Sequence, residues 1–270
     1  LIREFVPALE QGDFPVLGVL AAQVSWVAIW HERLRDARAY AERAVARIRA
    51  EGLLASLPLA LNALAWVQAL LGDWRSAEAT ANESIAIARE LNQTAFEIQP
   101  QTALALVAGA QGRVEEGRRL AARALEQGSR YEMDSGRTMA GWTLGRLELG
   151  IGHYEAAVAI LEPTGRFSLD RGLEEPAVAP WAQELTEAYI RLGRRGEAEA
   201  TLRVLEDQAE RSAGLRTPLP CAVADCSPTG TSTGTSARRW SGTWGCRIRS
   251  NGRARCCATA NGCAARAATT

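Results

Sequence analysis

A repeat of forty residues is the feature of this sequence that most restricts its fold. Small residues followed by apolar ones return in one register along most of the chain. The first small column consists of Ala37, Ala77, Gly117, Ala157 and Ala198, separated by 40, 40, 40 and 41 residues. A column four residues later holds Ala41, Ala81, Ala121, Leu161 and Leu202. Residues three or four apart share one face of an α-helix, so the columns predict an amphipathic helix in each repeat.

A second set of columns indicates another helix in each repeat, ahead of the first set. It contains Val24, Leu64, Leu104, Leu144 and Leu185, each followed by a small or short side chain. Glycines lie between the two sets, at Gly72, Gly112, Gly152 and Gly193. Glycine readily adopts the left-handed conformation that ends a helix, so each repeat is predicted to be a helix, a turn and a helix.

Prolines support these boundaries. Pro58, Pro100 and Pro180 stand where new first helices should begin, a place where a missing N–H costs little. Pro163 falls inside a second helix and is expected to shorten or kink it.

Stacking of these units gives the predicted fold. A single helical hairpin cannot bury its apolar face, whereas neighbouring hairpins can cover one another. The small columns would let helix backbones approach closely. We therefore predict an all-α, right-handed solenoid of about five stacked hairpins over residues 1–215, in which residues 1–10 are the second helix of an earlier repeat.

The residues at these positions carry a family resemblance. Leu64-Ala65, Gly72-Asp73-Trp74 and Ala77, and then Leu144-Gly145 and Gly152-His153-Tyr154, resemble the tetratricopeptide repeat, with its Leu-Gly, its Gly-Asp-Tyr turn and its second-helix alanine. The likeness covers roughly residues 11–213. The period of 40 differs from the family's 34, and the family's closing proline is missing. The resemblance implies a concave surface lined by first helices.

That surface is the expected binding site. Aromatic side chains often anchor partners, and five of the eight tryptophans lie in first helices. We expect Trp66 and Trp142 to pack between repeats. The candidate binding residues on the concave face are Trp26, Trp30, Gln68, Glu148, Trp181 and Tyr189. The expected partner is a protein or a small-molecule inducer.

Catalytic patterns are missing from the sequence. The two histidines, His31 and His153, lack the companions of a zinc-protease helix, and without any lysine the chain has no P-loop. The acidic residues are scattered over predicted helices. We therefore predict a protein that is not an enzyme and needs no metal or cofactor.

Charge and hydropathy bear on partners and location. The residues before Cys221 include 24 arginines and 30 acidic residues, so this part lacks the excess of positive charge that is typical of nucleic-acid-binding proteins. No apolar run is long enough to span a membrane, and the start lacks a signal-peptide pattern. We expect a cytoplasmic protein that does not bind nucleic acid or membranes directly. The first residue, Leu1, suggests a fragment.

The last segment, residues 216–270, differs in kind. It contains every cysteine, spaced as Cys221, Cys226, Cys246, Cys256, Cys257 and Cys263. This spacing lacks the two CxxC-type pairs that structural zinc sites usually have. Disulfides are rare in the reducing cytoplasm, where we expect this protein. A nucleic-acid-binding tail is possible from its arginines, but no predicted fold would support it. Large apolar residues are too few to offset the entropy of ordering, so we predict a disordered, low-complexity tail without a function of its own.

A shifted reading frame would explain this composition. Read one base early, residues 250–267 allow FERARTLLCYGERLRRAR, and the stretch around residues 226–236 allows LLADGDFDGHF with another Gly-Asp-Phe turn. The first string resembles the end of the helical-repeat region in large ATP-dependent LuxR-type regulators of the maltose-regulator class.

That resemblance implies a parent protein in three parts. An ATPase would lie upstream and a DNA-binding helix-turn-helix downstream of this non-catalytic sensor region, with the chain frameshifted or truncated at its C-terminus. The alternatives are a stand-alone repeat adaptor or scaffold and the repeat region of an ATPase-linked nucleotide cyclase. An all-α enzyme is a weaker alternative.

Overall fold

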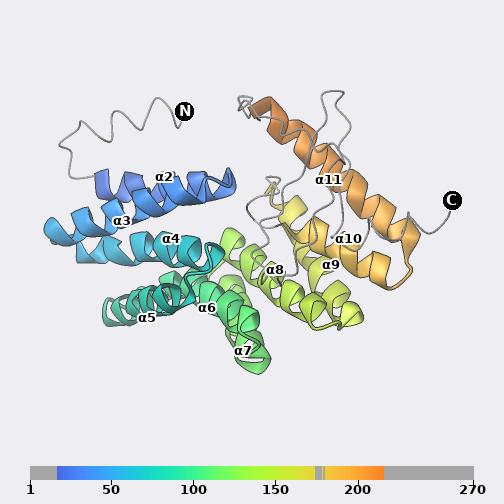
Figure 1. Cartoon of the computed structure of the whole chain (residues 1–270), viewed down its shortest axis with the longest axis horizontal. Helices are drawn as coiled ribbons and strands as arrows, with labels where there is room; N and C mark the ends of the chain where they lie inside the picture. Colours follow the sequence, from blue (N-terminus) through green and yellow to red (C-terminus); the bar gives the residue numbers. More distant parts are fainter. Residues whose placement is uncertain (1–16, 174–177, 179, 216–270) are drawn as a thin grey trace, which may run out of the picture. The chain divides into compact units, whose positions relative to one another are not determined.

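The computed structural model describes residues 17–173, 178 and 180–215, and within them it is all-α (Figure 1). The ten α-helices of this part are α2 (Leu17–Trp30), α3 (Leu34–Ala50), α4 (Leu57–Leu70), α5 (Trp74–Glu90), α6 (Ile98–Ala110), α7 (Val114–Arg130), α8 (Asp134–Gly150), α9 (Tyr154–Asp170), α10 (Trp181–Arg191) and α11 (Arg195–Leu215). Short 3-10 helices, η1 (Leu54–Ser56) and η2 (Thr94–Glu97), precede α4 and α6. The chain divides into two compact units, Leu1–Leu205 and Glu206–Thr270, so the last residues of α11 belong to the second unit.

The helices follow one another as five pairs, which confirms the predicted right-handed solenoid of hairpins. The first helices of neighbouring pairs contact one another, from α2 to α4, α6, α8 and α10 in turn. Each second helix through α9 also contacts the first helix of the next pair. First helices are therefore surrounded on several sides, which explains why α4 is buried along almost its whole length.

Within the described residues, each of the nine helices from α2 to α10 is followed by a turn with one left-handed residue. The Gly72 connection shows its geometry: φ is +81°, the Gly72 N–H donates to Ala69 O at 3.1 Å, and the Asp73 N–H donates to Gln68 O at 2.9 Å. This is the Schellman arrangement that closes a helix. The left-handed residues are Glu32, Gly52, Gly72, Asn92, Gly112, Glu132, Gly152, Gly172 and Gly193. The backbone thus repeats about every twenty residues, half the sequence period, because turns within and between hairpins are alike.

The small columns lie at close helix contacts, as predicted. Ala37, Ala77, Gly117, Ala157 and Ala198 are all buried. The closest approach to a backbone involves a glycine outside these columns: a Cβ added to Gly128 of α7 would lie 2.8 Å from the backbone N and Cα of Arg137 on α8. The two backbones therefore touch at this point.

The prolines lie close to the predicted boundaries, with one correction. Pro58 and Pro100 are in the first turns of α4 and α6, and Pro180 immediately precedes α10. The expectation that Pro163 shortens its helix was wrong, since α9 continues through it to Asp170. Pro163 and Ala159, four residues earlier, both lie on the exposed side, so water can bond the carbonyl that the proline leaves unpaired.

Two predicted segments lie outside the described residues. These are the second helix expected at residues 1–10 and the disordered tail at residues 216–270, together with every cysteine. In the described part, none of the helices combines the length and the apolar character needed to cross a membrane.

Candidate functional site

Three tryptophans form a buried aromatic bridge between first helices. The ring centroids of Trp26 and Trp66 are 6.2 Å apart, and those of Trp66 and Trp142 are 6.3 Å apart with the planes 24° from parallel. The Trp66 Nε1–H donates to Gln99 O at 3.1 Å. The packing role predicted for Trp66 and Trp142 is confirmed, and Trp26, a candidate for binding, is also only 4% exposed.

The other two candidate tryptophans lie at helix ends. Trp30 is the last residue of α2 and is half-buried against the core. Trp181 is the first residue of α10 and is buried, with its ring lying against Gly165 of α9. Trp181 therefore contributes to the contact between the fourth and fifth hairpins.

Glu148 is held by one partner from the preceding hairpin and one from the turn of its own hairpin. Arg118 of α7 donates to its carboxylate through Nε at 2.7 Å and Nη2 at 3.1 Å, and His153 Nδ1 lies 3.1 Å from Oε2. The hydrogen bond from Arg118 lowers the pKa of Glu148, although burial opposes this. The same arginine also donates to Glu115, so one guanidinium bridges two carboxylates.

The two remaining candidates are buried as well. The Tyr189 hydroxyl donates to Glu162, and the Arg194 guanidinium carbon lies 4.7 Å from the Tyr189 ring centroid. Burial, together with Glu162, raises the pKa of Tyr189 to about 12. Gln68 is 6% exposed, and its Oε1 has no partner within the described structure. Among described residues, no hydrogen bond or ion pair joins any two of the six candidates.

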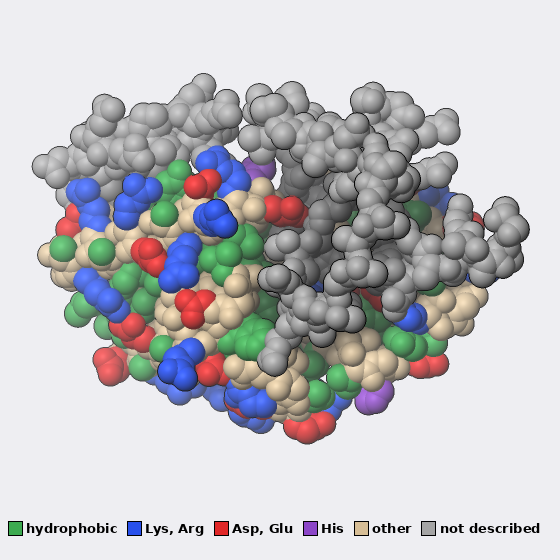
Figure 2. All heavy atoms as spheres, in the orientation of Figure 1, with side chains coloured by type: hydrophobic (Ala, Val, Ile, Leu, Met, Phe, Trp, Pro, Cys, Tyr) green, Lys and Arg blue, Asp and Glu red, His purple; other side chains and the backbone are tan. Residues whose placement is uncertain are grey.

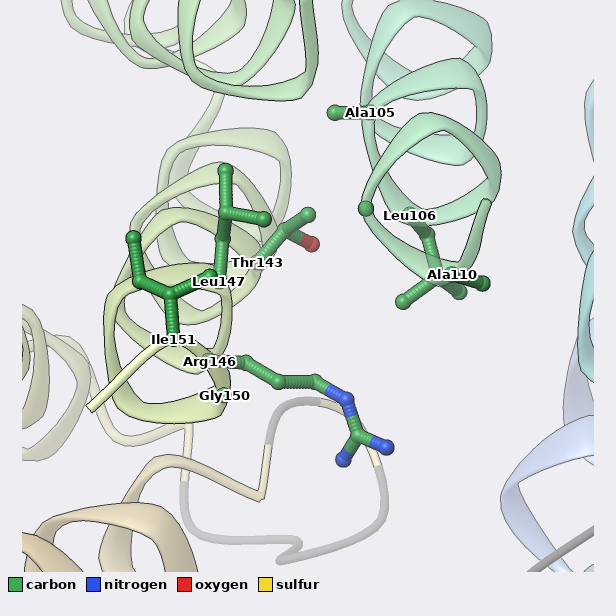
Figure 3. Close-up of a pocket in the computed structure, with 9 residues that line it drawn as sticks. Ala105, Leu106, Ala110, Thr143, Arg146, Leu147, Gly150 and Ile151 are labelled. Carbon is green, nitrogen blue, oxygen red and sulfur yellow. The ribbon is translucent and has the colours of Figure 1, made fainter. Parts of the chain in front are cut away.

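A pocket of about 240 Å³ lies between α6 and α8, the first helices of the third and fourth hairpins (Figure 3). Most of its wall is apolar. Its lining includes Leu106, Ala110, Thr143, Arg146, Leu147 and Ile151. None of these residues was a candidate from the sequence.

The repeat register explains why the pocket opens here. We define the end row as the last residues of the five first helices: Trp30, Leu70, Ala110, Gly150 and Arg191. The inner row lies four residues earlier, on the same helix face: Trp26, Trp66, Leu106, Arg146 and Glu187. The end row has large side chains, Trp30 and Leu70, in the first two hairpins but small residues, Ala110 and Gly150, in the next two. Both small residues line the pocket. The space is therefore where the repeat lacks its usual side chains.

Two polar groups face this space. Thr143 is 2% exposed, its side chain extends from α8 toward α6 in Figure 3, and its Oγ1 has no hydrogen-bond partner in the described structure. Arg146 donates through Nη1 to Glu184 of α10 at 2.6 Å, which is its only acceptor among described residues. Its guanidinium carbon lies 5.7 Å from the Trp142 ring centroid. Burial raises the pKa of the Glu184 carboxyl.

The surface charges are mixed in sign. Figure 2 shows arginine and acidic side chains alternating over the visible face of the described residues. Some arginine and acidic side chains pair between neighbouring hairpins, such as Arg38 with Asp73 at 3.5 Å and Arg49 with Glu83. Within the described ranges, histidine, cysteine and acidic side chains nowhere gather in a group of three or more able to hold a metal ion.

No protein-family model matches this chain, and no curated protein matches it. Several solved structures, in contrast, are similar to it. A Rap protein complexed with competence and sporulation factor matches 78% of this chain with a TM-score of 0.65 and 14% identity, over 58% of its own chain. The apo form of RapI gives a TM-score of 0.51 and 13% identity, covering 78% of this chain and 59% of its own. A putative kinesin light chain variant from Podosopora anserina, with nearly identical TPR-like repeats, gives 0.50 and 21%, covering 75% and 100%.

These structures show the fold. The chain folds as a TPR-like helical repeat, as the tetratricopeptide resemblance implied. It spans less than two thirds of the length of the Rap and RapI chains.

Proposed function

We propose that this chain is a non-catalytic helical-repeat module that binds a peptide or a small molecule at the pocket between α6 and α8. The observation that carries the proposal is the gap in the end row, where Ala110 and Gly150 replace the larger Trp30 and Leu70. Pockets between the helices of a bundle, with apolar walls and a few polar groups, are common ligand sites. Thr143 and Arg146 supply those polar groups.

The solved structures support a binding role in general terms. A Rap protein, which shares this fold, forms a complex with competence and sporulation factor. We extend to this chain a capacity to bind a partner, and not that particular factor. The six candidate residues from the sequence remain a proposal as contacts for a larger partner, and Trp30, which is half-buried, is the most accessible tryptophan among them.

A ligand screen with a blocked pocket tests the proposal. Short peptides and small organic acids, sugars and nucleotides would be tested for a shift in the melting temperature of the 270-residue chain. The same screen would use Gly150→Leu, which restores the side chain found at Leu70, and Gly196→Leu as a matched control on α11. A Cβ added to Gly150 or Gly196 meets no atom within 4 Å, so both positions have open space at the start of the new side chain.

We expect ligands that stabilise the original chain and the control but not Gly150→Leu. Ligands that stabilise all three proteins equally would refute this pocket as the site. Each ligand would also be assayed for conversion, because turnover would favour an all-α enzyme over a binding module.

We further propose that the module is the sensor region of a LuxR-type regulator, with an ATPase upstream and a helix-turn-helix downstream in the intact parent. Support comes from the shifted reading of residues 250–267, which lie outside the described part. Sequencing the gene through codon 221 and beyond tests this, because stop codons in the shifted frame would exclude it. Neighbouring reading frames that encode a cyclase, or no P-loop domain, would favour the cyclase-linked or the stand-alone adaptor alternative.

A further inference from the structure

We propose that the ligand of this pocket is a short branched aliphatic group bearing a carboxylate, and that Arg146 binds that carboxylate. The inference rests on the proposed function, since it names the chemistry of a ligand at the same site. It follows from the size of the pocket, the state of Arg146 and the environment of Thr143.

Size and lining define the apolar part of the ligand. A volume of about 240 Å³ equals roughly eight water molecules at about 30 Å³ each, which is less than drug-sized pockets of about 300–1,000 Å³. Leu106, Leu147 and Ile151 supply branched aliphatic walls. A ligand of about eight non-hydrogen atoms, such as a branched five-carbon chain together with its carboxylate, would therefore fill the pocket.

Arg146 and Arg118 both donate to carboxylates, but within the described structure Arg146 has one carboxylate partner where Arg118 has two. Arg118 donates through Nη1 to Glu115 and through Nε and Nη2 to Glu148, so its two edges hold two carboxylates. Arg146 donates through Nη1 to Glu184, while its Nε and Nη2 groups have no acceptor among described residues. That second edge has the fork geometry that binds a carboxylate through two parallel hydrogen bonds. The pair with Glu184 and the neighbouring Trp142 ring would hold the guanidinium in place.

Thr143 supplies a further polar contact. A hydroxyl that is buried without a hydrogen bond is costly, so a partner is expected. Thr143 lines the same pocket as Arg146 and lies three residues earlier on α8, hence on the same face. The hydroxyl oxygen is closed off from solvent in the free protein, so a carboxylate oxygen beside Arg146 would accept its hydrogen after a rotation of the Thr143 side chain toward the pocket.

The chemistry is shared by a free short acid and by the C-terminal residue of a peptide. The probes are therefore 4-methylpentanoate and its amide, and acetyl-Gly-Gly-Leu as the free acid and as the C-terminal amide. Binding to the 270-residue chain would be measured from methyl NMR shifts. We expect at least one acid to bind, with a dissociation constant on the order of 1 mM for a ligand of this size, and its amide to bind at least tenfold more weakly.

Three variants assign the effect. Arg146→Gln should weaken binding of the acid about tenfold and abolish the preference for acid over amide. Thr143→Val should weaken it a few-fold. Glu184→Gln removes the ion pair with Arg146 but keeps the Arg146 guanidinium, so it should retain the preference for acid over amide. It serves as the control for loosening the contact between α8 and α10.

Equal binding of acid and amide, or an unchanged preference in Arg146→Gln, would overturn the assignment. If Gly150→Leu still blocked both forms, the pocket would stand as the binding site and only the carboxylate assignment would fail. If no probe bound and Gly150→Leu changed no ligand found by the screen, the proposed function would fail with it. Binding of the peptide acid alone would support the carboxylate assignment and identify a peptide C-terminus as the source.

Discussion

Replacing Glu132 with glycine should make the protein more stable. Glu132 occupies the left-handed position of its turn, with φ of +53°, where six of the nine equivalent connections in the described residues use glycine. Its side chain is exposed and forms no hydrogen bond or ion pair within the described structure. The substitution therefore removes backbone strain without removing a known contact.

The magnitude follows from two opposing contributions. A residue with a Cβ costs about 1–2 kcal/mol in the left-handed conformation, while glycine loses about 0.5–1 kcal/mol more backbone entropy on folding. The net gain for Glu132→Gly is therefore about 0–1.5 kcal/mol, with a midpoint of about 0.75 kcal/mol. The reverse change, Gly72→Ala, should cost about 1 kcal/mol, and the cost is conformational because an added Cβ meets no atom within 4 Å. A change of 1 kcal/mol corresponds to a melting shift of about 2–4 °C at this chain length.

Urea unfolding followed by circular dichroism at 222 nm would measure both changes. Glu132→Ala is the control, because it removes the same side chain but keeps a Cβ, and it should give little gain. The double variant should show additive effects, since the two turns share no contacts. A loss of stability in Glu132→Gly, or an equal gain in Glu132→Ala, would refute the claim that the left-handed backbone conformation destabilises the protein when residue 132 carries a Cβ.

Three further changes test other parts of the structure. Gly128→Ala should destabilise the protein by about 1–3 kcal/mol in urea unfolding, because the new Cβ meets the Arg137 backbone, whereas Gly196→Ala should be neutral or stabilising; equal effects would contradict the close approach. Glu148→Gln should cost about 1–2 kcal/mol at pH 7. Because folding lowers the pKa of Glu148, its stabilisation is present above the unfolded value near 4.5 and is lost as pH falls through the folded value, so the difference between the two proteins should vanish in acid; a constant difference in melting temperature from pH 7 to 3 would contradict this. Thr143→Val should leave the melting temperature of the free protein unchanged or raise it slightly, since it removes an unpaired buried hydroxyl, and a clear decrease would show that the hydroxyl has a partner within the protein.

Most of the fold could be predicted from the sequence because the repeat appears as local residue patterns. The register of Ala77 and its equivalents indicates close helix contacts, and Gly72 indicates the turn, since both depend on the residue's own size or backbone freedom. The twenty-residue backbone period was missed because Glu32 and Glu132 adopt the turn conformation without being glycine.

The site was harder to predict because it depends on contacts between distant residues. Glu148 and Tyr189 were expected on a surface because they are polar residues of first helices. Their partners, Arg118 and Glu162, lie 30 and 27 residues away on neighbouring second helices, and no local pattern reveals such pairs. Trp26 was expected to be accessible near the end of the stack, but the next hairpin supplies the ring of Trp66 to cover it.

The pocket was missed for a different reason. Large or charged side chains mark candidate binding residues in a sequence, whereas this pocket arises where Ala110 and Gly150 lack them. Reading the last residue of each first helix as a row, Trp30, Leu70, Ala110, Gly150, would have shown the decrease in size. The turn glycines Gly72, Gly112 and Gly152 locate these helix ends in the sequence, because each lies two residues after the end of its helix.

The most direct test of the account is to map a ligand onto the methyl groups of the 270-residue chain by NMR, using whichever ligand the screen returns. The account expects the largest shifts at Leu106, Leu147 and Ile151, which line the pocket. The methyls of Ile48 and Leu61, which are buried in the first two hairpins, should remain unchanged. The largest shifts at Ile48 or Leu61, with the pocket methyls unmoved, would contradict the claim that the space between α6 and α8 is the binding site.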